Sequence, residues 1–330
     1  MVIKPMIRNS ICLNAHPAGL RIYVQDGIDY IKKQKKFTGP KNVLIVGGSA
    51  GYGLATRIAA AFGAGAKTLS IAFEKPASDR RAATAGWYAS EYFKTQAEAQ
   101  GLFTENIYGD AFSREIKDEA IAAVKKHFGG KVDLLVYSLA SGVRTDPRTG
   151  VVYRSVLKPI GAAYSAKSVN PLTGQLEEGS ISPATEEEIE ATIKVMGGED
   201  WELWVDALLE AGVLSQGAVS LAYSYIGPDM TRAVYRDGTI GRAKEHIENS
   251  AKVLDKKLKS SLGGAAYISV NKALVTRASA VIPVVPLYLG ILFKTMEKKG
   301  LQEDCIEQMY RLMTDRLYAG GSVPTDAEGR

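Results

Sequence analysis

A glycine-rich loop stands directly after an apolar run and before residues with helical spacing. The run is Asn42–Val46, and the loop consists of Gly47, Gly48, Ser49, Ala50, Gly51, Tyr52 and Gly53. Glycine has no Cβ, so it permits a tight turn and a close approach of the backbone to a diphosphate, and a following helix N-terminus offers N–H donors. The position between strand and helix favours a dinucleotide site over a purely structural turn.

An acidic residue follows the next predicted strand. Glu74 stands roughly 20 residues after the loop, at the end of the apolar run Thr68–Phe73. A carboxylate there can accept hydrogen bonds from the adenine ribose and repels a 2′-phosphate, which predicts NADH rather than NADPH. Lys75 could partly accommodate such a phosphate. The alternative for Glu74 is an exposed residue at a strand end.

Two further loops follow predicted strands and contain small or polar residues. The first is Asp110-Ala111, where an aspartate often approaches the adenine ring; a turn or capping aspartate is the alternative. The second contains Ser138, Leu139, Ala140 and Ser141. Its small residues let the backbone pass close to a nicotinamide ribose, with ordinary tight packing as the alternative.

Tyr235 and Lys244 are the candidates for proton transfer. Lys244 falls beside the apolar stripe of a helix predicted from Thr239 onward, and Tyr235 precedes that helix. A tyrosine near an ammonium group is a better proton donor, because the positive charge stabilises the phenolate and lowers the tyrosine pKa. Tyr223 and Tyr225 compete for this role. Without further support, a solvated lysine and a packing tyrosine would be the default interpretation.

Strands and helices alternate over residues 42–140, which positions these loops at one edge of a sheet. Helical spacing occurs after the glycine loop up to Gly63, at Trp87–Ala99, and after the capping residue Ser113. Parallel strands require such crossovers, so the prediction is an α/β fold with a Rossmann-type doubly wound parallel sheet. The expected strands are Asn42–Val46, Thr68–Phe73, Thr104–Tyr108 and Val132–Leu139.

The alternation of predicted strands and helices ends after residue 140. Residues 141–216 contain several turn signals and two helical segments, near Glu186–Met196 and Glu199–Ala211, and are too long for a simple connection. We interpret them as a substrate-binding insertion over the carboxyl edge of the sheet. Further strands are expected at Ala218–Tyr223 and Ala266–Val270, with a helix between them to about Leu258 and a last helix near Gln302–Leu317.

Composition limits the class of protein. The chain has 330 residues, 46% of them hydrophobic, which predicts one large domain over residues 1–330. The net charge of +5 comes from scattered basic residues, so no nucleic-acid partner is expected. The two cysteines, Cys12 and Cys305, form no CxxC pair, which argues against structural zinc and disulfides and favours the cytoplasm.

Other common chemistries lack their signatures. The histidines His16, His127 and His246 belong to no HExxH pattern and to no recognisable nucleophile setting, and no metal site is expected. The most apolar segment, Ala278–Phe293, contains two prolines and falls short of the ~20 residues that a membrane span needs. We therefore expect a buried segment and no stable membrane insertion.

The glycine loop and the tyrosine–lysine pair together resemble the short-chain dehydrogenase superfamily. The lysine follows Tyr235 at an unusual spacing, Tyr235-x8-Lys244, which is similar to that of the trans-2-enoyl-CoA reductases and the related V-type enoyl-ACP reductases. The resemblance extends over nearly the whole chain. It includes IRNSICLNAHPAG (Ile7–Gly19), GGSAGYGLATRIAAAFG (Gly47–Gly63), FEKP (Phe73–Pro76), GDAFS (Gly109–Ser113), DLLVYSLASGVRTDPRTG (Asp133–Gly150), KVMGGEDWELW (Lys194–Trp204), LAYSYIGPDMT (Leu221–Thr231) and SVNKALVTRASAVIPVVPLY (Ser269–Tyr288).

The resemblance implies roles for individual residues. Tyr235 would be the proton donor, Tyr225 would contact the acyl thioester, and Lys244 would bind the nicotinamide ribose. The residues implied in NADH binding besides Lys244 are the loop residues Gly47–Gly53 together with Phe73, Glu74, Asp110, Ala111, Leu139, Ala140, Leu274, Val275 and Thr276. The N-terminal segment 1–40 would form a small hairpin lid near the cofactor.

The expected reaction is the NADH-dependent reduction of a trans-2-enoyl thioester, on coenzyme A or acyl carrier protein, in fatty acid synthesis. The apolar segment Ala278–Phe293 would line the acyl pocket, and a monomer is expected. Family members usually continue beyond a segment like Ser322–Arg330, so a C-terminal helical portion is expected to be missing. A ketoreductase or alcohol dehydrogenase of the same superfamily, and a non-catalytic NADH-binding module, are the alternatives.

Overall fold

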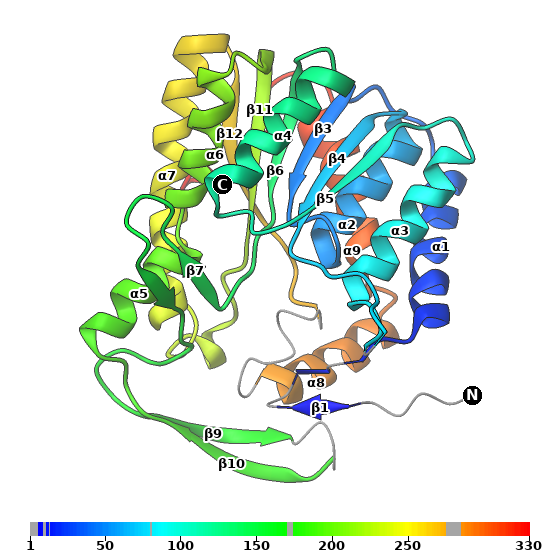
Figure 1. The fold of residues 1–330 in the computed structure, drawn as a ribbon. Coiled ribbons are helices and arrows are strands. Elements are labelled where there is room, and N and C mark those ends of the chain that lie inside the picture. Colours follow the sequence, from blue (N-terminus) through cyan, green and yellow to red (C-terminus); the bar gives the residue numbers. More distant parts are fainter. Residues whose placement is uncertain (1–5, 9–10, 13, 80, 170–173, 275–284) are drawn as a thin grey trace.

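The computed structural model describes residues 6–8, 11–12, 14–79, 81–169, 174–274 and 285–330. Its centre is a six-stranded parallel sheet in the order β12-β11-β6-β3-β4-β5 (Figure 1). This order confirms the predicted doubly wound sheet: all strands are parallel, and the order in which the chain adds them changes direction between β3 and β6. The strands are β3 (Asn42–Val46), β4 (Lys67–Ala72), β5 (Thr104–Tyr108), β6 (Val132–Tyr137), β11 (Leu214–Ser224) and β12 (Ala265–Val270).

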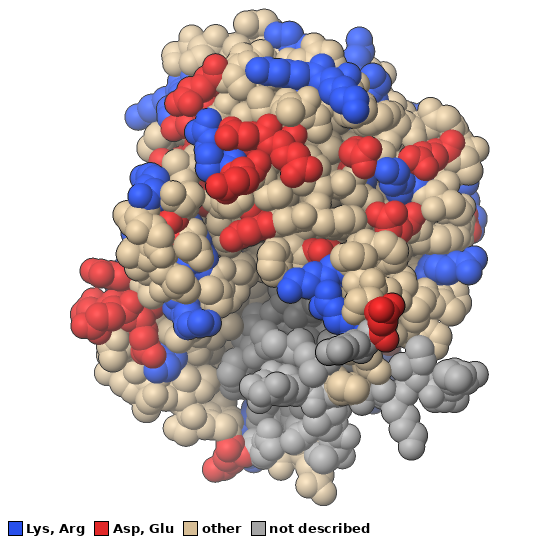
Figure 2. Space-filling model, viewed as in Figure 1, with Lys and Arg blue, Asp and Glu red and all other residues tan. Residues whose placement is uncertain are grey.

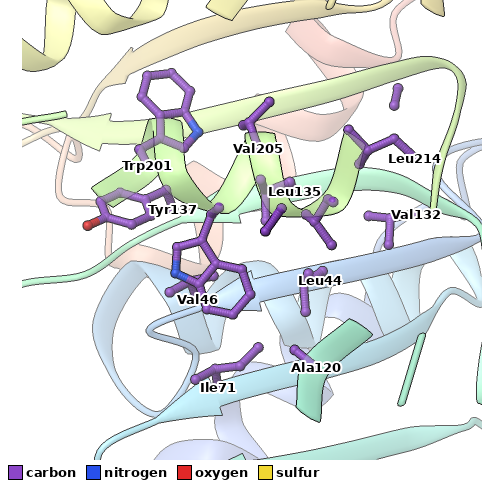
Figure 3. Close-up of a cluster of buried hydrophobic side chains, with 14 of the residues drawn as sticks. Leu44, Val46, Ile71, Ala120, Val132, Leu135, Tyr137, Trp201, Val205 and Leu214 are labelled. Carbon is purple, nitrogen blue, oxygen red and sulfur yellow. The ribbon is translucent and has the colours of Figure 1, made fainter. Parts of the chain in front are cut away.

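Helices cover both faces of the sheet, which explains why β3 is apolar throughout. Leu44 and Val46 face one core cluster with the helices α4 (Arg114–His127), α6 (Glu199–Glu210) and α7 (Thr239–Leu262) (Figure 3). Val43 and Ile45 face the other cluster, and all four side chains are fully buried. The helices on that second face are α1 (Pro17–Lys33), α2 (Gly51–Ile58, continued by a π-helical turn, Ala59–Gly63), α3 (Ala85–Glu98) and α9 (Cys305–Leu312, continued by Met313–Leu317).

The predicted insertion 141–216 divides into two parts. Helix α6 belongs to the layers of the sheet, because Trp201 and Trp204 are fully buried against it, and β11 already begins at Leu214. The part that extends beyond the sheet is therefore residues 141–198. It contains two antiparallel hairpins that were not predicted, and a helix: β7 (Val143–Thr145) with β8 (Val152–Arg154), β9 (Tyr164–Val169) with β10 (Leu176–Ile181), and α5 (Glu186–Met196).

The N-terminal segment 1–40 is only in small part a hairpin. Its strands are β1 (Ile7–Arg8) and β2 (Ile11–Cys12), and helix α1 accounts for most of the rest. Pro17 occupies the first turn of α1, and the Nδ1 atom of His16 accepts a hydrogen bond from the N–H of Gly19 at 3.0 Å. The lid prediction thus overlooked a helix that packs into the core.

The apolar segment Ala278–Phe293 is described only from Val285, where helix α8 (Val285–Lys298) begins. Within it Leu289 is buried, but Ile291 is 62% exposed, so the expectation of a buried segment holds only in part. Figure 1 shows α8 and the β9–β10 hairpin at the same end of the molecule, and the two elements are in contact. No helix in the described ranges is both long and apolar enough to cross a bilayer.

Candidate active site

The glycine loop lies at the carboxyl end of β3, where the order of the sheet reverses. Gly47 has φ +93°, and a Cβ added to it would lie 2.5 Å from the carbonyl oxygen of Ser138. A Cβ added to Gly53 would lie 2.1 Å from the carbonyl oxygen of Gly47. The loop therefore packs backbone against backbone, and both positions require glycine for steric reasons.

The N-terminus of helix α2, which follows the loop, is open to an anion. Its N-cap residue is Ala50, which makes no side-chain capping hydrogen bond, and its first turn contains no acidic residue. The first N–H groups of a helix lack partners within the helix and carry partial positive charge. These residues fit the diphosphate of a dinucleotide.

Tyr52 connects this loop to the loop after β12. Its hydroxyl donates a hydrogen bond to the carbonyl oxygen of Lys272 at 2.7 Å and lies 3.0 Å from Oε1 of Gln308. The same Oε1 atom accepts the N–H of Lys272. The side chain of Tyr52 thus holds the backbone at Lys272, two residues before the buried residue Leu274. Sequence reasoning missed Gln308, which comes from the distant helix α9.

The carboxylate of Glu74 lies against the glycine loop. Ser49 Oγ donates a hydrogen bond to it at 2.9 Å, and a Cβ added to Gly86 in the first turn of α3 would lie 2.0 Å from Glu74 Oε1. Sequence reasoning missed Gly86. The ammonium group of Lys75 lies 5.6 Å from the ring centroid of Phe73, whose side chain is exposed. The acidic group at this point therefore has a fixed position.

We expect Glu74→Ala to relax discrimination against NADPH, because the carboxylate that repels a 2′-phosphate is removed. The ratio of kcat/KM for NADPH to that for NADH should rise at least about 10-fold, or ~1.4 kcal/mol. Steady-state kinetics with both cofactors measure this ratio. Glu119→Ala, which removes an exposed acid on α4, is the control. An unchanged ratio in Glu74→Ala would assign the preference to another residue.

The loops after β5 and β6 are placed as the sheet order requires. Asp110 Oδ1 accepts the N–H of Phe112 at 3.0 Å, so it serves as a turn residue, and Ala111 beside it is buried. The N–H of Ser138 donates to the carbonyl oxygen of Val46 at 2.8 Å. That bond brings the backbone of Leu139 and Ala140 next to the glycine loop. Contact of these residues with a cofactor stays a prediction.

Tyr225 and Tyr235 form an edge-to-face pair. Their ring centroids lie 4.9 Å apart with an interplanar angle of 73°, and Tyr235 is 7% exposed. Burial, and secondarily Tyr225, raises the pKa of Tyr235, and burial raises the pKa of Tyr225 to about 12. The expectation that Lys244 lowers the pKa of Tyr235 is wrong here, because burial of the phenol dominates.

Lys244 lies in the second turn of α7. Burial lowers its pKa to about 8, although Glu248 acts in the opposite direction. Glu248 itself forms an ion pair with Arg236, with an N–O distance of 2.9 Å. Among the residues that the structure describes, no carboxylate lies within ion-pair distance of the Lys244 ammonium group, and its contact with a ribose stays a prediction.

We expect NADH affinity to fall as the pH rises through about 8. Because the pKa of Lys244 is lowered, its ammonium group is charged below this pH and loses its proton above it, which weakens its hydrogen bonds to ribose hydroxyl groups. Fluorescence titration of NADH binding across this range measures the effect. Lys244→Arg stays charged and should show no inflection there, whereas an identical inflection in this variant would exclude Lys244 as the titrating group.

Two glycines let the Tyr235 turn pack against α7. A Cβ added to Gly241 would lie 1.8 Å from the carbonyl oxygen of Arg236, and one added to Gly238 would lie 2.7 Å from that of Lys158. The N–H of Thr239 donates to the same Lys158 oxygen at 3.0 Å. The turn with Tyr235, the helix with Lys244 and the insertion therefore meet at one place. Sequence reasoning missed the role of Gly241.

Some predicted site residues lie outside the described part of the chain. These are Val275 and Thr276, whereas Leu274, just before them, is described and buried. Within the described ranges, no group of three or more histidine, cysteine, aspartate or glutamate side chains could hold a metal ion.

The sheet order and the glycine loop at its switch point define a Rossmann-type, dinucleotide-binding protein. The chain matches two family descriptions, "NAD(P)H binding domain of trans-2-enoyl-CoA reductase" over residues 2–79 and "Trans-2-enoyl-CoA reductase catalytic region" over residues 81–318. It therefore belongs to the trans-2-enoyl-CoA reductase family.

Individual relatives agree with this assignment over the full chain. A trans-2-enoyl-CoA reductase (NADH) of Brachyspira hyodysenteriae is 56% identical over 100% of this chain and 85% of its own length. An enoyl-acyl-carrier-protein reductase (NADH) of Coxiella burnetii is 53% identical over 100% and 82%. The crystal structure of Clostridium acetobutylicum trans-2-enoyl-CoA reductase with NADH superposes with a TM-score of 0.97 at 46% identity, covering 100% of this chain and 83% of that one.

Proposed function

We propose that this protein reduces trans-2-enoyl thioesters to saturated acyl thioesters with NADH. The observation that carries the proposal is the Tyr225–Tyr235 pair beside α7, in a chain that shares its whole length with NADH-dependent enoyl reductases. NADH, when bound, supplies a hydride, which adds to the β-carbon of the enoyl group. Negative charge then develops on the thioester oxygen as an enolate.

The tyrosine pair would stabilise this oxyanion. A raised pKa keeps Tyr235 protonated at neutral pH, so its hydroxyl is present as a donor when the charge develops. Tyr225 would add a second donor. Preorganised donors of this kind are commonly worth about 100- to 1000-fold in rate. The α-carbon then receives a proton from Tyr235, directly or through water, and Lys244 would hold the nicotinamide ribose.

A substrate comparison separates the candidate activities. With NADH, crotonyl-CoA should be consumed rapidly and acetoacetyl-CoA slowly, as followed by the loss of NADH absorbance. Faster reduction of acetoacetyl-CoA would favour a ketoreductase. NADH binding without turnover of either substrate would favour a non-catalytic binding module.

The carrier and the acyl chain length are the finer part of the proposal. Both coenzyme A and acyl carrier protein occur in the names of relatives at similar identity. Kinetics with matched acyl groups on the two carriers, from short to medium chains, would choose between them. A monomeric, cytoplasmic enzyme remains our prediction.

A further inference from the structure

A buried ion pair lies beneath the loop that follows β5. Lys117 of α4 and Asp200 of α6 approach to 2.8 Å, and their side chains are only 4% and 2% exposed. The hydroxyl of Tyr137 on β6 donates to the other carboxylate oxygen of Asp200 at 3.1 Å. Burying two charges is costly, and apolar residues of similar volume often stabilise a core as well or better. Packing of the helices alone therefore does not require this pair.

Lys117 of this pair also bonds to two backbone carbonyl groups of the loop. Lys117 Nζ donates to Asp200, to the Ala111 oxygen at 2.9 Å and to the Phe112 oxygen at 3.1 Å, which uses all three of its protons. Trp204 Nε1 also donates to the Ala111 oxygen at 3.1 Å. An apolar replacement could fill this space but could not hold the two carbonyl groups.

The first turn of α6 also reaches the insertion. Glu199, next to Asp200, accepts a hydrogen bond from Arg144 of β7 at 2.7 Å. The Arg144 guanidinium group lies 5.6 Å from the ring centroid of Phe112 and is 1% exposed. The loop after β5 is thus fixed from α4, from α6 and from the insertion at once.

We propose that Lys117 and Asp200 are positioning residues for NADH binding. They hold the Asp110–Phe112 loop in the conformation that receives the adenine ring. The proposal rests on the cofactor site of the proposed function. A loop that is already ordered loses less freedom when its ligand binds, so its affinity is higher. Removal of the Lys117–Asp200 ion pair should therefore weaken binding of the adenosine half of the cofactor and leave the chemical step unchanged.

The test uses the charge-free double variant Lys117→Met/Asp200→Leu. We expect a lower Tm, because the Tyr137 hydroxyl and the two carbonyl groups lose partners, an NADH KM raised about 10-fold, corresponding to the loss of two hydrogen bonds, and kcat at saturating NADH within about 2-fold. Titration with AMP, which carries only the adenosine part, should show the same loss of affinity. A stable double variant with unchanged KM for NADH and unchanged AMP affinity would overturn the proposal.

Two further variants keep the test decisive. If the double variant fails to fold, Lys117→Met/Asp200→Asn keeps an acceptor for the Tyr137 hydroxyl while it removes the Lys117 bonds to the loop, and an unchanged affinity for NADH and AMP would again overturn the proposal. Ser250→Ala loosens α6 elsewhere, because Ser250 bonds to Glu202. It should lower Tm without changing NADH affinity, and an equal loss of affinity would assign the effect to α6 packing in general. The Kd values for NADH and AMP are measured by titration without acyl substrate, so this part of the test can be read even if the proposed reaction fails, whereas KM and kcat require the reaction.

Discussion

Tyr235→Phe is expected to lower turnover of an enoyl thioester about 100- to 1000-fold while NADH still binds. The substitution removes only the hydroxyl, and the ring would keep its edge-to-face contact with Tyr225. Because the oxyanion forms only during the reaction, the loss should fall on kcat rather than on the Kd for NADH. Steady-state kinetics with crotonyl-CoA and fluorescence titration with NADH measure the two quantities.

The matched control is Tyr223→Phe. The Tyr223 hydroxyl is bonded to Thr56 of α2, and so it is already occupied within the core. We expect turnover within about 3-fold of the wild type, the scale of one modest hydrogen bond. If Tyr223→Phe abolished turnover and Tyr235→Phe did not, the assignment of the proton donor would be wrong.

Gly47→Ala is expected to weaken NADH binding about 100-fold, or ~2.8 kcal/mol. The new Cβ would lie 2.5 Å from the Ser138 oxygen, so the glycine loop or the loop after β6 must move. Both loops are predicted to contact the cofactor. Fluorescence titration of NADH gives the Kd, and thermal unfolding shows whether the protein still folds.

Gly65→Ala separates the collision from the backbone cost. Gly65 also has positive φ, +72°, but an added Cβ would have nothing within 4 Å. It should cost about 1 kcal/mol in the free energy of unfolding and leave NADH affinity unchanged. Equal losses of affinity in both variants would mean that the close packing of Gly47 has no special role.

Local patterns were enough to predict the central sheet. The apolar run Asn42–Val46 became β3 with the same bounds, and Ser113 caps α4 as predicted, its Oγ accepting the N–H of Ile116. These features depend on residues close together in the chain. The strands β7 and β8 of the first hairpin have only three residues each, which leaves no alternation to detect. Helix α1 did carry a signal, since Val24, Ile28 and Ile31 have helical spacing and are buried.

The positions of the candidate loops in the fold could be predicted from the sequence, but the contacts among their residues could not. The sequence places Glu74 at a strand end, but it does not show that Gly86 of helix α3 lies against its carboxylate. Similarly, the bond of Tyr52 to Lys272 spans most of the chain. The pKa of Tyr235 was misjudged for the same reason, because burial is a property of the folded protein. Such contacts require the tertiary structure.

Transfer of deuterium from NADH to an enoyl thioester tests the central claim most directly. The protein would be incubated with crotonyl-CoA and NADH that carries deuterium at the transferable position of the nicotinamide, and the product would be examined by NMR and mass spectrometry. We expect butyryl-CoA with the deuterium on its β-carbon. A hydroxyacyl product, deuterium on the α-carbon, or no saturated product in the presence of bound NADH would contradict hydride transfer to the enoyl group.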